Sequence, residues 1–371
     1  MGAIKVIMPF LIFVGFLCFH PGAVLAEDYV HTPVHYYDIN HGLTIAKPVF
    51  SISQDVTLDT NLSMRFTVDR VKTEVSGVDA ISGATQYVGA SAQGSTDTRK
   101  EIAVSVAHVI GEWKIEPGYL LSVEHDYKSH APSITVSKDF FQRNTTLTMG
   151  YAHNFDEVMG VYLEVSEDKN INNYAISLTQ VLTSETIAQI GYTFSDGSGY
   201  MGTGNRKVRL ENDQEMDEFL PEERGREAVG FRIAQWLPTN GSVQFSYRYY
   251  TDDWQIDSNT YQVQINQYVA DAILVRGEYR YYDQSGAYFV KDSYTGAEKY
   301  LTSATSLRAF NADLYGIKLI YAVRGPMDRD WDWDWDWDWD WDWDLEAKYE
   351  RYTQSNDLEA NIFMLGIRLP L

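Results

Sequence analysis

Hydrophobic and polar side chains alternate with a period of two along most of the chain after about residue 30. Clear examples are residues 61–68, 101–110 and 260–266, where Leu, Met, Phe, Val, Ile or Tyr occupies nearly every second position. This alternation indicates β-strands with one apolar and one polar face. No comparably clear run has helical periodicity, so the pattern predicts an all-β protein.

The connections between these strands alternate in length. Tight turns at one end of the strands and long loops at the other end are typical of a transmembrane β-barrel. A soluble β-sandwich is the alternative, but it rarely contains so many consecutive hairpins. The short connections are 55–59, 111–112, 141–144, 183–185, 238–241 and 269–271, and the long ones are 76–98, 156–170, 197–226 and 284–305.

We therefore predict an all-β fold, a single antiparallel transmembrane β-barrel of about 16 strands (14–18 also fit), with short periplasmic turns and long extracellular loops. The last strand places Phe363, Leu365 and Ile367 on one face, as barrel-insertion machinery requires, although the final residue is Leu371 and not the usual Phe. The predicted strands are 30–38, 43–55, 58–75, 99–110, 113–127, 130–140, 144–155, 171–183, 185–196, 227–238, 241–252, 257–269, 271–283, 306–322, 345–354 and 358–371.

Residues 1–26 have the pattern of a cleaved secretory signal. Lys5 precedes an apolar run at 6–19, and small residues at 24–26 form a cleavage site. A transmembrane anchor is the alternative, but the run is short. Cys18, the one cysteine, lies inside this signal, so the mature barrel (27–371) would have no thiol for a disulfide or a metal. We expect export to the Gram-negative outer membrane, with its lipids and the barrel-insertion machinery as partners.

The charge balance excludes one class of partner. The chain has 30 Lys+Arg and 52 Asp+Glu, a net charge of −22. Nucleic-acid binding depends on clustered basic residues, so we expect no nucleic-acid partner.

Charged side chains with the phase of the polar face should point into the barrel. We predict a basic wall facing an acidic wall across a constriction, since rings of charge set ion selectivity in wide barrels. The alternative is that Glu278 and its Arg neighbours form salt bridges that fill the lumen. The pore-lining candidates are Arg232, Arg248, Arg276, Glu278, Arg280, Glu116, Glu124 and Asp126.

Tyrosine pairs precede three predicted outer connections. A tyrosine ring suits the lipid headgroup layer because its body is apolar and its hydroxyl is polar. We interpret the pairs as an aromatic girdle, with a carbohydrate-stacking platform as the alternative. The girdle candidates are Tyr36, Tyr37, Tyr249, Tyr250, Tyr281 and Tyr282.

The sequence contains no convincing catalytic or metal motif. The acidic loop 197–226 lacks the spacing of a calcium loop, so we expect a solvated loop or a plug. No Gly-x-Ser-x-Gly elbow occurs, and His108, His125 and His153 have the outward phase. We therefore expect no enzyme activity, no cofactor and no metal.

Residues 330–344 alternate strictly, with eight Asp and seven Trp. The Trp positions share the phase of Leu345 and Tyr349, so the tract extends the next strand in register. At about 3.3 Å per residue it would span roughly 50 Å, more than the hydrocarbon core of a bilayer. A tolerated repeat expansion is the favoured interpretation. A docking segment for a periplasmic partner is the second, and a metal or electron-relay array is the third.

Four segments resemble an uncharacterised bacterial family, a domain of unknown function whose members are expected to be outer-membrane β-barrels. They are residues 78–85 with Asp97 and Arg99, then 141–147, 246–254 and 280–289. Members are often encoded near periplasmic thioredoxin-like and flavin-attaching proteins, so the resemblance implies a link to envelope redox chemistry. The Asp-Trp tract is not part of the family pattern.

Together these features predict a porin-like pore for small polar solutes. The alternatives are a non-conducting barrel that anchors or sheathes a periplasmic redox partner, and a surface receptor or adhesin that acts through its long loops.

Overall fold

The computed structural model describes residues 28–40, 42–73, 80–81, 86–87, 96–160, 162–324 and 343–371. The predicted signal 1–26, residues 330–342 of the Asp-Trp tract and most of segment 78–85 lie outside the described residues. Their interpretations therefore stay predictions.

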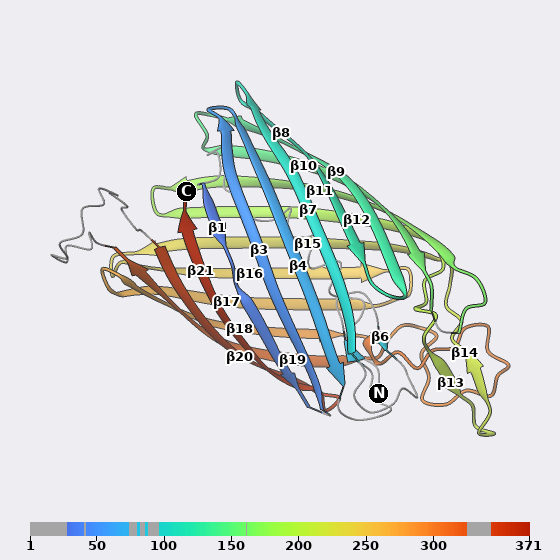
Figure 1. The fold of residues 1–371 in the computed structure, drawn as a ribbon. Helices are drawn as coiled ribbons and strands as arrows, with labels where there is room; N and C mark the ends of the chain where they lie inside the picture. Colours follow the sequence, from blue (N-terminus) through green and yellow to red (C-terminus); the bar gives the residue numbers. More distant parts are fainter. Residues whose placement is uncertain are drawn as a thin grey trace, which may run out of the picture.

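The described chain forms one closed antiparallel barrel of tilted strands (Figure 1). The first strand of its wall is interrupted at Thr32-Pro33 and consists of β1 (Tyr29–His31) and β2 (Val34–Ile39). Fifteen further strands complete the wall: β3 (Leu43–Thr57), β4 (Thr60–Thr73), β7 (Thr96–Ile110), β8 (Trp113–Val123), β9 (Tyr127–Phe140), β10 (Thr145–Val158), β11 (Glu167–Thr183), β12 (Thr186–Gly199), β15 (Glu223–Leu237), β16 (Gly241–Asp252), β17 (Asp257–Ala270), β18 (Ile273–Gln284), β19 (Phe310–Val323), β20 (Trp343–Gln354) and β21 (Glu359–Pro370).

Four short strands lie outside the wall and pair as β5 (Ala80–Ile81) with β6 (Gln86–Tyr87) and β13 (Lys207–Arg209) with β14 (Glu215–Asp217). A single 3-10 turn spans Thr305–Leu307. No helix within the described ranges is long and apolar enough to cross a membrane.

The barrel closes where its first and last strands meet. β21 pairs with β20 on one side and with both β1 and β2 on the other, while β1 and β2 also pair with β3. Counting β1 and β2 as one interrupted strand gives the 16 strands that the sequence predicts, which confirms the predicted fold. Closure leaves no unpaired strand edge, as a bilayer requires.

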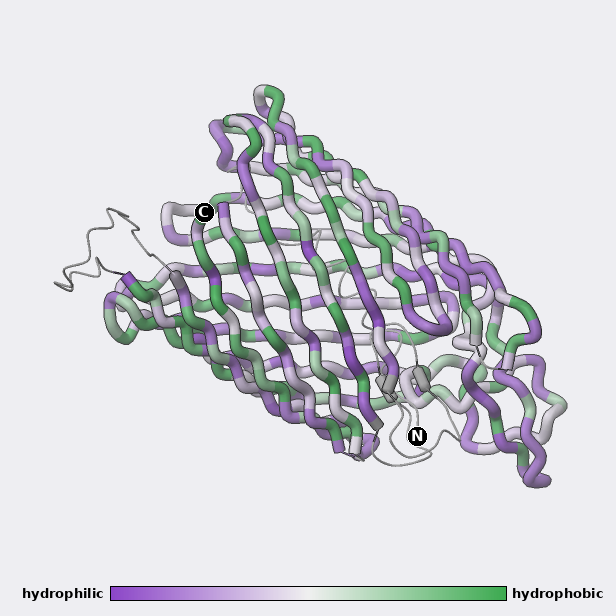
Figure 2. The backbone as a smooth tube through the Cα atoms, in the orientation of Figure 1, coloured by the Kyte–Doolittle hydropathy of each residue, from purple (hydrophilic) through white to green (hydrophobic). Residues whose placement is uncertain are grey.

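Side chains alternate between the two surfaces of the wall. In β7, Ile102 and Val106 are exposed on the outside, whereas Glu101, Ala103 and Ser105 are buried inside. Figure 2 shows this alternation of hydrophobic and hydrophilic residues along the strands. An apolar outside and a polar inside are the reverse of a soluble protein and match a barrel surrounded by lipid.

Two belts of outward aromatic rings border the aliphatic part of this surface. One lies near the short turns and contains Trp113, Trp236, Tyr268 and Tyr321, and the other lies near the long loops and contains Tyr36, Tyr249, Tyr279, Tyr315 and Tyr349. In the second belt, tyrosine hydroxyl groups donate to polar side chains of the neighbouring strand. For example, Tyr249 donates to Asp257 at 2.9 Å and Tyr279 donates to Asp313 at 2.7 Å. Paired aromatic belts mark the two interfaces of a membrane.

The predicted girdle is therefore only half right. Tyr36 and Tyr249 are exposed on the outside, and Tyr281 shares that phase, but the second tyrosine of each pair points inward because neighbouring residues of a strand face opposite sides. The prediction for these second tyrosines is wrong. Tyr37, Tyr250 and Tyr282 line the interior of the barrel.

Candidate functional site

Three long loops join into one structure at the end of the barrel opposite the short turns (Figure 1). We call loops 159–166, 200–222 and 285–309 together the cap. Phe219 and Leu301 exchange backbone hydrogen bonds of 3.0 and 2.9 Å, and the N–H of Tyr162 donates to the carbonyl of Gly204 at 2.9 Å. The long loops are therefore fixed to one another by their backbones.

Trp254 is the centre of the cap's apolar core. Its ring meets Phe289 edge-on, with centroids 5.3 Å apart, and packs in one buried cluster with Tyr250, Ile256 and Leu307. Its Nε1 donates to the carbonyl of Glu223 at 3.0 Å. This core attaches loop 285–309 to the ends of β15 and β16.

The acidic loop 200–222 has a solvated tip and a buried base. Glu211, Asp213, Glu215 and Asp217 are exposed, as the prediction of a solvated loop requires. Glu218 is instead buried and forms a 2.6 Å ion pair with Arg206, and its carboxylate also accepts from the hydroxyl of Thr302. The loop lies over the barrel end and contributes to the ceiling of a cavity below it.

Asp252 organises the start of the cap. One carboxylate oxygen accepts the backbone N–H groups of Trp254 and Ile256 at 3.0 and 2.9 Å. The other accepts from Nε of Arg224 at 2.9 Å and from the hydroxyl of Tyr250 at 2.7 Å. The Arg224 guanidinium also lies 4.1 Å from the centroid of the Trp254 ring. Arg224 is thus a fully buried, neutralised cation.

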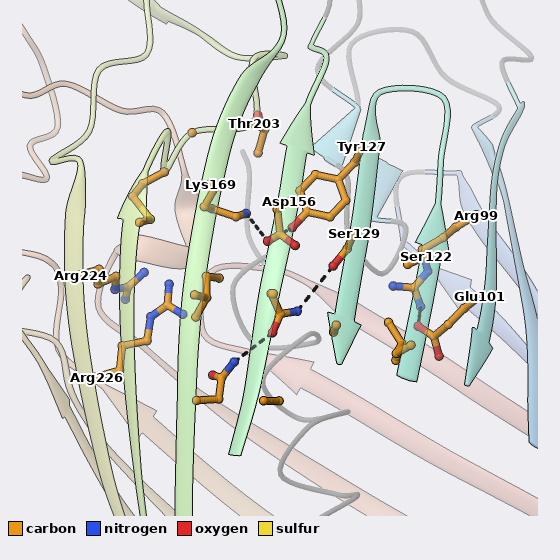
Figure 3. A pocket seen from close by; sticks show the side chains of 18 of the residues that line it. Arg99, Glu101, Ser122, Tyr127, Ser129, Asp156, Lys169, Thr203, Arg224 and Arg226 are labelled. Atoms are coloured by element: carbon orange, nitrogen blue, oxygen red, sulfur yellow. Dashed lines mark hydrogen bonds and ion pairs between the residues drawn. The ribbon is translucent and has the colours of Figure 1, made fainter. Parts of the chain in front are cut away.

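Beneath the cap, the barrel interior contains a cavity of about 220 Å³, which we call the chamber. Figure 3 shows charged side chains of several strands pointing into it. On β9 to β11, Asp156 accepts from the Tyr127 hydroxyl and lies 3.4 Å from Lys169 Nζ. On β7, Arg99 forms a 2.6 Å ion pair with Asp69 of β4. The chamber is therefore lined by ion pairs and not by an apolar core alone.

A second interior cavity of about 620 Å³ extends along β15 to β21. Four of the predicted pore residues, Arg232, Arg248, Glu278 and Arg280, line it. Arg276 donates from Nε to Asn266 at 2.6 Å. These strands thus bring the predicted basic residues to one side of the interior.

Glu278 does not pair with its arginine neighbours. Its two carboxylate oxygens accept from Gln262 at 2.7 Å and Gln264 at 3.0 Å, and Lys348 Nζ lies 4.0 Å away. The alternative of an Arg–Glu278 network that fills the lumen is therefore wrong. The reason is register, since Gln264 lies directly opposite Glu278 on β17.

The predicted acidic wall is also wrong as a wall of one sign. Glu116 pairs with Lys114 at 3.4 Å and accepts from Ser105 at 3.0 Å. Arg65, Arg99 and Lys169 lie on the same half of the barrel. Carboxylates inside a barrel cost free energy unless they are paired, so cations accompany them.

Glu124 and Asp126, also assigned to that wall, lie at the connection from β8 to β9. With Asp97 they form an acidic trio whose oxygens lie within 4.8 Å of one another, the one such group among the residues that the structure describes. The Asn205 amide of the cap donates to Asp126. Asp126 thus attaches the cap to the barrel instead of lining a constriction, and Glu124 lies beside it in the trio.

The two cavities share three lining residues, Arg224, Arg226 and Ser306. The sequence prediction missed both arginines because it began the strand at residue 227, whereas β15 begins at Glu223. The sequence does contain a pattern that identifies these two arginines as inward-facing. Arg224, Arg226 and Arg232 share the even, inward phase of Ala228 and Gly230, so the alternation could have been followed further back.

A family model described as "Protein of unknown function (DUF3570)" matches residues 23–164 and 160–363. The chain belongs to this family. Two of the segments that resembled it, 246–254 and 280–289, contribute Tyr250, Asp252, Trp254 and Phe289 to the base of the cap. The DUF3570 description states no function, and no curated protein matches the chain.

Several solved barrels resemble this DUF3570 chain in outline. The outer membrane protein OpdK from Pseudomonas aeruginosa is 9% identical over 93% of this chain and 98% of that one, with a TM-score of 0.47. A BenF-like porin from Pseudomonas fluorescens is 7% identical over 93% and 98%, with a TM-score of 0.45. The siderophore receptor PirA from Pseudomonas aeruginosa is 8% identical over 89% and 57%, with a TM-score of 0.44.

Proposed function

We propose that this protein is an outer-membrane conduit for small polar solutes. The observation that carries the proposal is the pair of interior cavities that share Arg224, Arg226 and Ser306 inside a closed barrel. Sixteen strands are enough to leave an aqueous interior. A conduit needs no catalytic group, and we propose no enzyme activity.

The outside of the barrel supports the membrane assignment. Its apolar surface lies between two aromatic belts, and the wall has no free edge, as insertion into a bilayer requires. We place the barrel in the Gram-negative outer membrane, inserted by the barrel-insertion machinery after cleavage of residues 1–26. The short turns then face the periplasm and the cap faces outward.

The interior supports polar solutes. The wall of the larger cavity carries amides, hydroxyls and charges beside its apolar side chains, among them Gln262, Thr260, Ser258 and Arg280. Such groups replace the hydration of a polar solute during passage. Buried apolar residues gather in the cap core and in one interior cluster of Ile39, Leu43, Ile45, Val71 and Ala360, which leaves polar groups on the strands β16 to β18 to face a solute.

Reconstitution tests the proposal. The purified full chain in a planar bilayer should give discrete conductance steps, and liposomes that contain it should swell in small sugars or amino acids. The matched control is the same protein heat-denatured before reconstitution. A folded chain that inserts, as judged by a heat-dependent shift in gel mobility, but passes neither ions nor solutes would overturn the proposal.

A second function is favoured by the place of the Asp-Trp tract. β19 ends at Val323 and β20 begins at Trp343, so residues 324–342 join two adjacent strands at the turn end of the barrel. In the proposed orientation they face the periplasm, where an acidic, aromatic segment suits docking of a periplasmic partner, including the redox partner that the family resemblance implies. Deletion of 330–342 should abolish recovery of a crosslinked periplasmic partner and leave conductance unchanged.

A further inference from the structure

We infer that the chamber binds a small organic anion, a carboxylate attached to a short apolar body, with Arg226 at the junction of the two cavities as the anchoring cation. This inference rests on the proposed conduit and names the solute class that it selects.

The first step is the charge of the chamber wall. Its lining contains six cations and three carboxylates. Each carboxylate already has a cation: Glu101 lies 3.8 Å from Arg99, Asp156 lies 3.4 Å from Lys169, and Glu218 lies 2.6 Å from Arg206. Behind the lining, Asp69 pairs with Arg99 and Asp252 pairs with Arg224, so five carboxylates stand against the six cations. The excess is therefore one positive charge, and a solute that enters the chamber meets a wall that favours anions.

The second step is the state of Arg226. Asp252 is its direct cross-strand neighbour on β16, but the oxygens of Asp252 are directed to Arg224, Tyr250 and the backbone at the start of the cap. Among the described residues, no carboxylate forms an ion pair with Arg226, and its Nε is shielded from solvent without a hydrogen-bond acceptor. A guanidinium can only donate, so it lacks an anion.

Two hydroxyl groups on β12 are also buried without a hydrogen-bond partner among the described residues. Ser195 is directly opposite Arg226, and Thr193 follows on the same face of the strand. Within the described chain, neither side-chain oxygen has a hydrogen-bond partner. Buried donors without acceptors are costly, and an oxyanion held at this position would satisfy them.

The third step is the apolar part of the wall. Leu120 points inward on β8 between Ala103 and Ala131, and the half-buried Leu220 forms part of the ceiling under the cap. An inorganic ion would leave these side chains in contact with water. A carboxylate that carries a short hydrocarbon body would bury them while its head remained at Arg226.

Figure 3 shows the geometry that this requires. Arg224 and Arg226 extend into the pocket from β15 on one side, and Lys169 and Asp156 come from β11 and β10 beyond β12. Arg224 is held in place by Asp252 and Trp254, and Asp252 neutralises its charge, so it is not available as a partner for a second anion. Arg226 is thus the group that an anion reaches as it passes from one cavity to the other.

Ion selectivity of the reconstituted full chain is the first test. Under a tenfold KCl gradient, the wild type should prefer chloride over potassium. Arg226→Gln should reduce the chloride preference at least about twofold, since one fixed positive charge leaves the junction. Arg226→Lys should keep the preference. The matched control is Arg209→Gln, which removes the same charge from the exposed tip of the cap.

A chain-length series is the second test and uses the wild type itself. Acetate, butyrate and hexanoate should block the chloride current with affinities that rise two- to four-fold per added methylene, roughly the fold-change for burial of a CH₂ group. Inorganic phosphate should block more weakly than hexanoate, and hexylammonium should not block. Leu120→Thr should flatten the length dependence without changing ion selectivity. Arg226→Gln should weaken the hexanoate block about tenfold.

The outcomes separate the inference from the proposed function. A chain that conducts but prefers potassium, or that hexanoate blocks no better than acetate, overturns the inference and leaves the conduit standing. Equal hexanoate block in the wild type and Arg226→Gln would place the anion elsewhere and also overturn it. A folded, inserted chain that carries no current overturns both.

Discussion

Nη1 of Arg206 lies 2.6 Å from Oε1 of Glu218, and both side chains are buried where the β13–β14 hairpin leaves the cap. The pair is isolated from solvent, so removal of one partner leaves the other charge buried without a counter-charge. Such a loss typically costs about 3–5 kcal/mol. Because the pair lies outside the wall, the cost should fall on the cap and not on the barrel.

We therefore expect Arg206→Met to loosen loop 200–222 while the strands stay folded. The measurement is limited proteolysis of the inserted protein, followed by mass spectrometry of the cleavage sites. Arg209→Met is the matched control, because the Arg209–Asp213 pair is exposed and such pairs contribute at most about 1 kcal/mol. Equal protection of the loop in wild type and Arg206→Met would contradict the assigned role.

Replacement of Trp254 should open the cap more completely. Trp254→Ala removes a buried ring, its stacking on Arg224 and its hydrogen bond to Glu223, a loss of about 3–5 kcal/mol for the ring alone. Single-channel conductance should rise because loop 285–309 loses its attachment over the chamber. Trp236→Ala, in the lipid-facing aromatic belt near the short turns, should lower the thermal stability of the barrel without raising conductance. An unchanged conductance in Trp254→Ala would show that the cap does not limit the flow.

Loops 159–166 and 200–222 meet at two glycines that have no room for a side chain. A Cβ on Gly160 would lie 2.3 Å from the backbone of Gly204, which itself has a φ of +67°. Gly160→Ala should therefore separate the loops and raise hydrogen exchange at Tyr162, whose N–H is bonded to Gly204. Gly277→Ala in β18 is the control, since a Cβ there meets nothing within 4 Å.

Glu298 makes one turn of the cap sensitive to acid. Desolvation raises the pKa of this carboxyl, but hydrogen bonds from backbone N–H groups and from Lys291 outweigh it and lower the pKa to about 2. A lowered pKa means that the carboxylate stabilises the turn above its ordinary value of 4.5, and that this stabilisation is lost as the pH falls toward 2.

Hydrogen exchange at Thr295 and Gly296, corrected for the intrinsic effect of pH, should therefore accelerate between pH 4.5 and about 2. In Glu298→Gln the exchange should be faster at neutral pH and should not change over this window. A wild-type turn whose protection is constant down to pH 2 would rule out this role of the carboxylate.

The wall of the barrel could be predicted from the sequence because each strand is recognised by its own alternation. Ile102, Val104 and Val106 indicate an outward face without information about any other strand. The same local rule, applied strictly, would also have divided each tyrosine pair between two faces. Grouping Tyr249 with Tyr250 by composition hid that division.

The cap and the junction could not be predicted in this way. Trp254, Leu307 and Glu223 come together only when connections more than 50 residues apart in the chain pack over the same opening. Likewise, Asp252 lies opposite Arg226 but binds Arg224, and this choice depends on side-chain geometry within one register. Local patterns carry no information about which of two neighbouring cations receives a carboxylate.

The seam between β21 and the β1–β2 strand joins the two ends of the described chain. The N–H of Leu371 donates to the carbonyl of Asp28 at 3.0 Å, and Arg368 lies over the ring of Tyr29 at 4.5 Å. A chain without β21 would be an open sheet with two unpaired edges, apolar on one surface and polar on the other. Unpaired backbone groups at such edges are costly in a bilayer, so the wall becomes stable in the membrane only when the last strand in the chain pairs with the first.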